Sequence, residues 1–210
     1  SDDVIIGLSS TGKATYEKEY NSGMGSNGLT SARHDVLNKY YLEKYPESFD
    51  PNTDTKYLYA GSKRLTDKLD GTPLDYGKAL LSPTKTYAPV IKTMLQELPK
   101  QIHSLVHCTG GAQTKVLHFI DDLKIIKDHL FPTPPLFSAI QKESGTSWQE
   151  MYKVFNMGHR MEIYTNKKNA QAVIDIANSF NIEAQIIGRV EAYKGKQVEI
   201  KTENGTFIYQ

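Results

Sequence analysis

The chain has 210 residues, 39% hydrophobic and 23% charged, which is typical of a folded globular protein with a buried core. Lys and Arg number 25 against 24 Asp and Glu, and the resulting net charge of +1 argues against nucleic-acid binding through bulk charge. No signal segment is recognisable, and no apolar run approaches the roughly 18 residues of a membrane span. The single cysteine, Cys108, leaves no internal disulfide, so we expect a cytoplasmic protein with no membrane partner.

The first part of the chain predicts a strand, a loop and a helix. Residues 4–8 are apolar and β-branched, as in a buried strand. Residues 9–25 are polar without a clear period and predict a long surface loop. Apolar side chains then recur at helical spacing over residues 29–40, with Ser26 or Asn27 as the expected N-cap. The abrupt start of the chain on a strand indicates a piece cut at a domain boundary.

Residues 45–80 carry several prolines and many Asx, Thr and Gly residues, which predict an irregular excursion. Strand-like and helix-like patterns alternate after it. The predicted elements are a helix over 88–98, a strand over 102–106, a short helix over 112–120, helical turns from 134 and within 147–155, a strand over 161–164, a helix over 170–177, a strand over 184–190, and a hairpin of 198–201 with 206–209. Because this alternation lacks strict βαβ regularity, we expect an α+β fold, a layered domain with a mixed β-sheet packed by helices.

Two glycine-flanked helix starts are candidate phosphate sites. In HCTGG, the segment Thr109–Gly111 follows a predicted strand, and His107 lies two residues before it. In GSNGL, the segment Ser26–Gly28 opens the first helix. Backbone amides at such a start, free of obstructing side chains, favour a phosphate. The alternatives are a tight turn with a hydrogen-bonded core histidine in the first case and simple helix capping in the second.

A third motif, KVFNMGHRMEIY, leads from Asn156 and Gly158 into a strand. Gly158 would allow close approach of a ligand or of backbone. His159 and Arg160 could face a phosphate, but solvated charge at the end of a strand is the slightly favoured interpretation.

The spacing of the histidine, cysteine and aspartate residues gives little support for a metal site. The six histidines form no HExxH arrangement, and Cys108 has no partner for a zinc cluster. Cys108 at the end of an apolar strand is expected to be inert. Asp121 and Asp122 could hold Mg²⁺ through phosphates, although adjacent acids at the end of a helix are usually solvated. We therefore predict no metal site formed by the chain alone.

Taken in order, DVIIGLSSTG, GSNGLTSAR, LLSPTKTYAPVI, HSLVHCTGGAQTKV, MYKVFNMGHRMEI and AQIIGRV resemble the C-terminal half of the phosphoribosylformylglycinamidine cyclo-ligases, also called aminoimidazole ribonucleotide synthetases. The resemblance covers nearly the whole chain apart from residues 9–24 and 45–75. It implies that residues 1–210 are one domain of this type without the N-terminal half. The same superfamily includes selenophosphate synthetase, the hydrogenase-maturation carbamoyl-dehydratase, thiamine monophosphate kinase and formylglycinamidine ribonucleotide synthetase.

The resemblance implies an ATP-dependent ring closure in purine biosynthesis. ATP activates the formyl oxygen of formylglycinamidine ribonucleotide as an iminophosphate, a neighbouring nitrogen attacks, and phosphate leaves as the imidazole closes. In this family the N-terminal half provides most of the ATP and Mg²⁺ site and the core of a homodimer. A chain without that half would be catalytically incomplete.

The family motifs match this sequence residue by residue. The resemblance implies substrate or phosphate contacts by Ser26, Asn27, Gly28, Thr109, Gly110, Gly111, Asn156 and Gly158, with His107 as the catalytic candidate. Two positions depart from the pattern: Gly25 stands where the family commonly has histidine, and Ala112 stands where it has a third glycine. The departure at Gly25 leaves open which residue replaces that histidine.

Two other functions remain open at this stage. The chain could belong to another ATP-dependent member of the superfamily, such as a selenophosphate-synthetase-like or hydrogenase-maturation-like enzyme. It could also be a module that binds a phosphorylated metabolite without catalysis.

Overall fold

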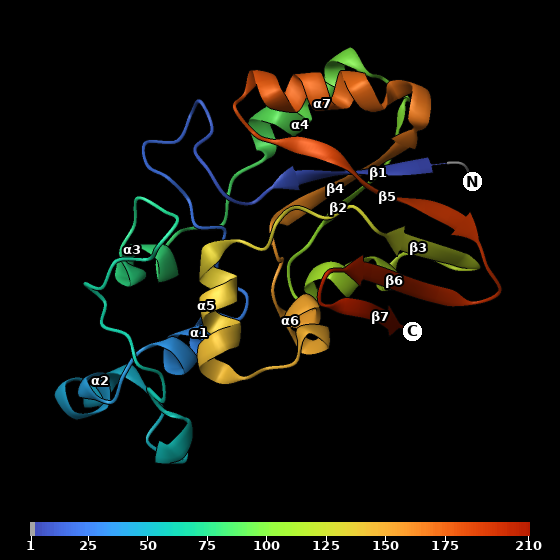
Figure 1. Ribbon diagram of the computed structural model, residues 1–210. Coiled ribbons are helices and arrows are strands. Elements are labelled where there is room, and N and C mark those ends of the chain that lie inside the picture. Colours follow the sequence, from blue (N-terminus) through green and yellow to red (C-terminus); the bar gives the residue numbers. More distant parts are fainter. Residues whose placement is uncertain (1–2) are drawn as a thin grey trace.

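A single seven-stranded sheet organises the chain in the computed structural model, which describes residues 3–210 (Figure 1). The strand order is β2-β4-β1-β5-β3-β6-β7. All neighbours pair antiparallel except β3 and β6, which pair parallel, so the sheet is mixed as predicted. The strands are β1 (Asp3–Ser9), β2 (Ile102–His107), β3 (Leu123–Lys127), β4 (His159–Asn166), β5 (Ala184–Ala192), β6 (Lys196–Thr202) and β7 (Gly205–Tyr209).

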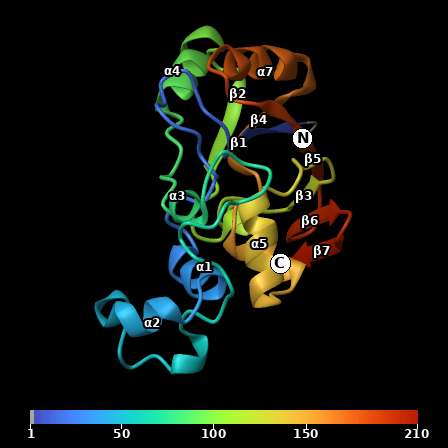
Figure 2. The same ribbon diagram turned by 60° about the vertical axis from the view of Figure 1, so that its left-hand side comes forward.

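Helices cover both faces of this sheet, which confirms the expected layered α+β fold (Figures 1 and 2). The α-helices are α1 (Leu29–Val36), α2 (Tyr40–Lys44), α3 (Tyr76–Leu80), α4 (Ala88–Glu97), α5 (Pro135–Ser144), α6 (Trp148–Val154) and α7 (Ala170–Ser179). Short 3₁₀ helices add η1 (Pro46–Ser48), η2 (Thr55–Tyr57), η3 (Ala112–His118) and η4 (Lys167–Asn169).

The central strand β1 is buried on both faces, which explains its continuous apolar run. Val4, Ile6 and Leu8 pack with the buried side chains of α4 and α7 on one face. Ile5 points to the opposite face, into a larger core that includes buried residues of α1, α3, α5 and α6. Side chains alternate between the two faces of a strand, so this one strand supplies both cores.

The N-terminal part differs from the prediction in three ways. The helix predicted over 29–40 ends at Val36, where Leu37 turns to an extended conformation. The region 45–80 is less irregular than predicted, since it contains α3, η1 and η2. Residues 9–25 are not simply a surface loop, because Ser10, Ala14 and Met24 are buried against the rest of the fold.

Two elements in the middle of the chain were also missed or misjudged. The strand β3 was not predicted, because its sequence LKIIK is short and follows two aspartates that favour a turn. The segment predicted as a helix over 112–120 forms the 3₁₀ helix η3.

The hairpin predicted at the C-terminal end is confirmed, with β6 and β7 antiparallel on either side of its turn.

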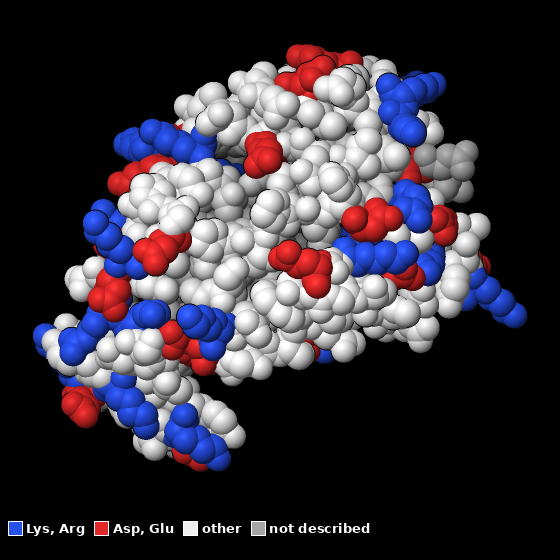
Figure 3. Space-filling view, viewed as in Figure 1, with Lys and Arg blue, Asp and Glu red and all other residues white. Residues whose placement is uncertain are grey.

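Charged residues of both signs are interspersed over the face in Figure 3, in line with the near-zero net charge. Within residues 3–210, no helix combines the length and apolar character needed to cross a bilayer.

The burial of β1 gives a test of the fold. Ile6→Ala should lower the free energy of unfolding by about 2–5 kcal/mol, because Ile6 is fully buried and the cavity would be lined by α4 and α7. Ile208→Ala, on a β7 side chain that is 50% exposed, should change it by less than about 0.5 kcal/mol. Denaturant unfolding of both variants measures the difference, and equal losses would contradict the two-faced core.

Candidate anion-binding site

The motif segments, far apart in sequence, meet at one edge of the sheet. The amide of Gly25 donates to the carbonyl of Ser82 at 3.1 Å, and the amide of Cys108 donates to the carbonyl of Arg160 at 2.7 Å. A Cβ built on Gly110 would lie 3.7 Å from the amide nitrogen of the Asn27 side chain. The first corner (Gly25–Leu29) and the second corner (Thr109–Gly111) are therefore neighbours, as the shared-site hypothesis requires.

The first corner begins α1 without a side-chain cap. Gly28, not Ser26 or Asn27, is the N-cap residue, and it adopts a left-handed conformation with φ 74°. A side chain at Gly28 would overlap the Phe155 ring, so glycine is required there for space as well as for φ. The predicted caps were wrong because this close packing decides the turn. Ser26 is exposed and Asn27 half-buried.

Both corners present backbone amides that have no acceptor in the protein. Among residues 3–210, no hydrogen bond is donated by the amides of Ser26, Asn27, Gly28, Gly110 and Gly111. Gly110 is exposed and Thr109 half-buried, so the second corner reaches the surface. Neighbouring backbone amides without protein acceptors can bind an anion.

The side chain of Arg160 lies directly beneath the first corner. Its Nη2 donates to the carbonyl of Met24 at 2.7 Å and its Nη1 to the hydroxyl of Thr84 at 3.3 Å. Arg160 is only 1% exposed, and it forms no ion pair with any carboxylate in the described part of the chain. The interpretation of His159 and Arg160 as solvated charge is therefore wrong, since His159 is also 1% exposed.

His107 is the second unusual group at this edge. Its Nε2 is buried and has no hydrogen-bond partner within residues 3–210. Burial lowers the pKa of His107, and the positive charge of Arg160 lowers it further. The imidazole is therefore held neutral at neutral pH, and one of its ring nitrogens is buried without a partner.

Asn156 holds the loop between β1 and α1 in place. Its side-chain oxygen accepts from the hydroxyl of Ser10 at 2.7 Å and from the amide of Gly158 at 3.2 Å. Its side-chain nitrogen donates to the carbonyl of Gly23 at 2.8 Å. These bonds show a positioning role, and direct contact with a substrate remains a prediction. Gly158 packs closely on residues 131–134, so the close approach it allows is to protein.

A buried charge cluster that the sequence did not reveal supports the second corner from below. Lys127 of β3 forms an ion pair with Glu162 of β4, and both side chains are fully buried. The ammonium of Lys127 also donates to the backbone carbonyl and side-chain oxygen of Gln113, at 2.7 and 3.0 Å. Gln113 belongs to η3, directly after the second corner. The only signal in the sequence was a charged residue within each of two apolar runs.

Glu162 has two further partners in this cluster. The hydroxyl of Tyr164 donates to one of its carboxylate oxygens at 2.6 Å, and His159 Nε2 lies 3.0 Å from the other. Burial acts to raise the pKa of Glu162, but Lys127 and His159 outweigh it and hold that pKa well below the ordinary value. The carboxylate therefore stays charged at neutral pH.

The structure also brings together possible metal ligands that the spacing did not predict. Ligand atoms of Cys108, His159 and Glu162 lie within 4.8 Å of one another. The ammonium of Lys127 already neutralises Glu162, and a thiol beside an imidazole does not suit Mg²⁺. Burial raises the pKa of Cys108 well above the ordinary value, as an inert thiol requires.

The other acidic pair considered from the sequence lies on the surface. Asp121 forms an ion pair with Lys196, and Asp122 accepts from the amide of Gly195. Both carboxylates are thus engaged around the start of β3, away from the two corners.

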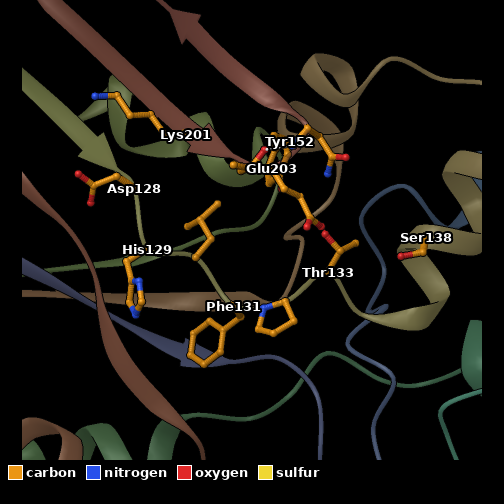
Figure 4. Close-up of a pocket in the computed structure, with 12 residues that line it drawn as sticks. Asp128, His129, Phe131, Thr133, Ser138, Tyr152, Lys201 and Glu203 are labelled. Carbon is orange, nitrogen blue, oxygen red and sulfur yellow. Dashed lines mark hydrogen bonds between the residues drawn. The ribbon is translucent and has the colours of Figure 1, made fainter.

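A separate cavity of about 590 Å³ opens between α5, α6 and the β6–β7 turn (Figure 4). Asp128, His129, Thr133, Tyr152, Lys201 and Glu203 are among its lining residues. No residue of either corner lines it, and the lysine there already pairs with Glu199. The motifs of the sequence therefore identify a different surface from this cavity.

Residues 60–201 match the family described as AIR synthase related protein, C-terminal domain. The chain belongs to this family. A phosphoribosylformylglycinamidine cyclo-ligase of Methanocaldococcus jannaschii is 31% identical over 192 residues, covering 90% of this chain and 44% of the relative. One of Methanopyrus kandleri is 28% identical over 200 residues, covering 94% of this chain and 46% of the relative.

This member of the AIR synthase related family thus spans less than half the length of the curated relatives it matches. A crystal structure of E. coli HypE, a hydrogenase maturation protein, is 17% identical with a TM-score of 0.49, covering 99% of this chain and 49% of that one. That likeness adds nothing to the assignment.

The buried ion pair gives a test with a defined pH dependence. Lys127→Met should lower the free energy of unfolding at pH 7 by about 3–5 kcal/mol, because Glu162 would stay buried without its cation. In the unaltered chain the low pKa of Glu162 stabilises the fold above the ordinary Glu pKa, and this contribution is lost as the pH falls into the acid range. In the Lys127→Met variant, the loss of stability between pH 7 and pH 4 should be smaller than in the unaltered chain.

Denaturant unfolding at pH 7 and at pH 4 measures both effects. Lys196→Met is the matched control, because it removes a lysine that pairs with exposed Asp121, and it should change stability little. Equal stability of the Lys127 variant and the unaltered chain would show that the pair contributes nothing net.

Proposed function

We propose that the chain is the C-terminal domain of a phosphoribosylformylglycinamidine cyclo-ligase, which closes the imidazole ring of formylglycinamidine ribonucleotide at the expense of ATP. The products would be aminoimidazole ribonucleotide, ADP and phosphate. The observation that carries this proposal is the meeting of the first and second corners around unpaired amides in a chain of this family. The names of the relatives support the reaction.

In this proposal the two corners bind a phosphate group and stabilise charge that develops during phosphoryl transfer. The amides of Ser26–Gly28 and Gly110–Gly111 donate to no protein acceptor, so no existing hydrogen bond would have to break before they bind charge. The Thr109 hydroxyl would add a donor. His107, neutral and with one unpaired nitrogen, would contact the reacting groups and is the proposed catalytic residue.

ATP and Mg²⁺ are expected to be held mainly by a further half of the protein. Within residues 3–210 the one cluster of three metal-ligating groups does not suit Mg²⁺, so no step is assigned to this ion here. By the same proposal, the complete enzyme is a cytoplasmic homodimer and the present chain is inactive alone.

The decisive experiment compares the 210-residue chain with the same chain joined to the N-terminal half of the Methanocaldococcus jannaschii relative. Ring closure of formylglycinamidine ribonucleotide with ATP is measured for both. Turnover only in the joined protein supports the proposal. ATP consumption with another acceptor would indicate a different member of the superfamily, and tight binding of a phosphorylated metabolite without turnover would indicate a binding module.

The corner residue Asn27 provides a point test within the joined protein. Asn27→Ala should lower kcat/KM for ring closure about tenfold, the loss expected for a hydrogen bond to a charged group. Its half-buried side chain borders the second corner and is not used as a cap, so folding should be unaffected. Asn178→Ala, on the exposed face of α7, is the matched control and should leave kcat/KM unchanged. Equal kcat/KM values for the two variants would show that Asn27 does not contribute to the site.

A further inference from the structure

Arg160 is a buried cation without a counter-ion. Its two hydrogen bonds go to the carbonyl of Met24 and the hydroxyl of Thr84, which are both neutral acceptors. A guanidinium taken out of water is costly unless an opposite charge compensates it. The other buried cations among the described residues, Lys127 and Lys85, have such partners in Glu162 and Glu17. Arg160 has none among residues 3–210, so the fold leaves one positive charge uncompensated at this edge.

The position of this charge is set by Gly25. A Cβ built on Gly25 would lie 2.5–2.6 Å from three atoms of the Arg160 guanidinium, which is closer than side-chain atoms pack. Gly25 also has φ 62°, a conformation that residues with side chains rarely adopt. Glycine at this position thus lets the guanidinium lie directly against the backbone of the first corner.

Several groups near Arg160 lack a hydrogen-bond partner in the protein and could bind an anion. The unpaired amides of Ser26 and Asn27 follow Gly25 directly, and the Asn27 side chain lies beside Gly110, whose own amide is also unpaired. The buried, unpaired Nε2 of His107 lies close enough to Arg160 for the guanidinium charge to depress imidazole protonation. Positive charge and free donors therefore gather on one side of the sheet edge.

We infer that Arg160 is the cation of a phosphate-binding site, and that Gly25 is the residue that makes room for it. The bound phosphate would accept hydrogen bonds from the corner amides and compensate the guanidinium beneath Gly25. Arg160 thereby supplies the charge that a side chain at position 25 would otherwise have to supply. It is a binding residue, and it joins the two corners into one site.

Two sources could provide this phosphate group: the 5-phosphate of a ribose and the phosphates of a nucleotide. The shared chemistry is a tetrahedral phosphate with two or more negative charges. Titrations with inorganic phosphate, ribose 5-phosphate and ATP separate the sources, because the favoured source should bind more tightly than inorganic phosphate. This inference concerns the site of the proposed function, but its test requires no turnover.

The test measures phosphate binding to the 210-residue chain by calorimetry and by amide chemical shifts, at ionic strength matched with sodium chloride. Inorganic phosphate should bind saturably and shift the amides of Ser26–Gly28 and Gly110–Gly111. Arg160→Gln should weaken binding about tenfold or more, since a charge-assisted contact is lost. Arg189→Gln removes an exposed arginine engaged with Asp128 and Glu191, and should bind as the unaltered chain does.

Two further variants keep the test decisive if Arg160→Gln does not fold. Arg160→Lys keeps the charge but loses the planar fork, and should bind with intermediate affinity. Gly25→Ala should displace the guanidinium and weaken phosphate binding as well. Phosphate binding that is unchanged in the folded Arg160 variants would overturn the inference, and so would equal loss in the Arg189 variant or no saturable binding at all. Phosphate binding that depends on Arg160, without ring closure in the joined protein, would refute the proposed function alone.

Discussion

The arrangement of the candidate site depends on two buried charged residues of β4, Glu162 and Arg160. Glu162, paired with Lys127, ties β4 to β3 and to η3 through Gln113, and so fixes the second corner from below. Arg160 on the same strand reaches the carbonyl of Met24 and fixes the first corner. One charge is compensated inside the protein and the other is not. The compensated pair holds β4 to β3 and η3, whereas the uncompensated charge is the one that we propose binds phosphate.

The motifs that carry the family resemblance also position the two corners. The Asn156 side chain forms hydrogen bonds with the Ser10 hydroxyl, the Gly23 carbonyl and the Gly158 amide. The Asn-Met-Gly motif thereby positions the loop that leads into the first corner. The amides of Ser-Asn-Gly and of the two glycines in Thr-Gly-Gly donate to no protein acceptor, and Gly110 lies beside the Asn27 side chain.

The sequence predicted the fold class and the strand β1 from local patterns of apolar residues, and it predicted the proximity of the two corners from their likeness to each other and to the family motifs. It did not predict the role of Arg160 or the pair of Lys127 with Glu162. Both depend on partners more than 30 residues away, which periodicity and spacing do not reveal. The N-cap of α1 was wrong for a related reason, since contact with Phe155 makes Gly28 the only residue that fits.

The placement of β1 in the middle of the sheet has a consequence for biosynthesis. Val4 pairs with Thr165 on one side and with Arg189 on the other, so β1 leaves the ribosome long before either of the strands that pair with it. Such long-range pairing is slow to form. We therefore expect the apolar β1 segment to stay unpaired until β4 and β5 have been synthesised, a state in which chaperones would bind it.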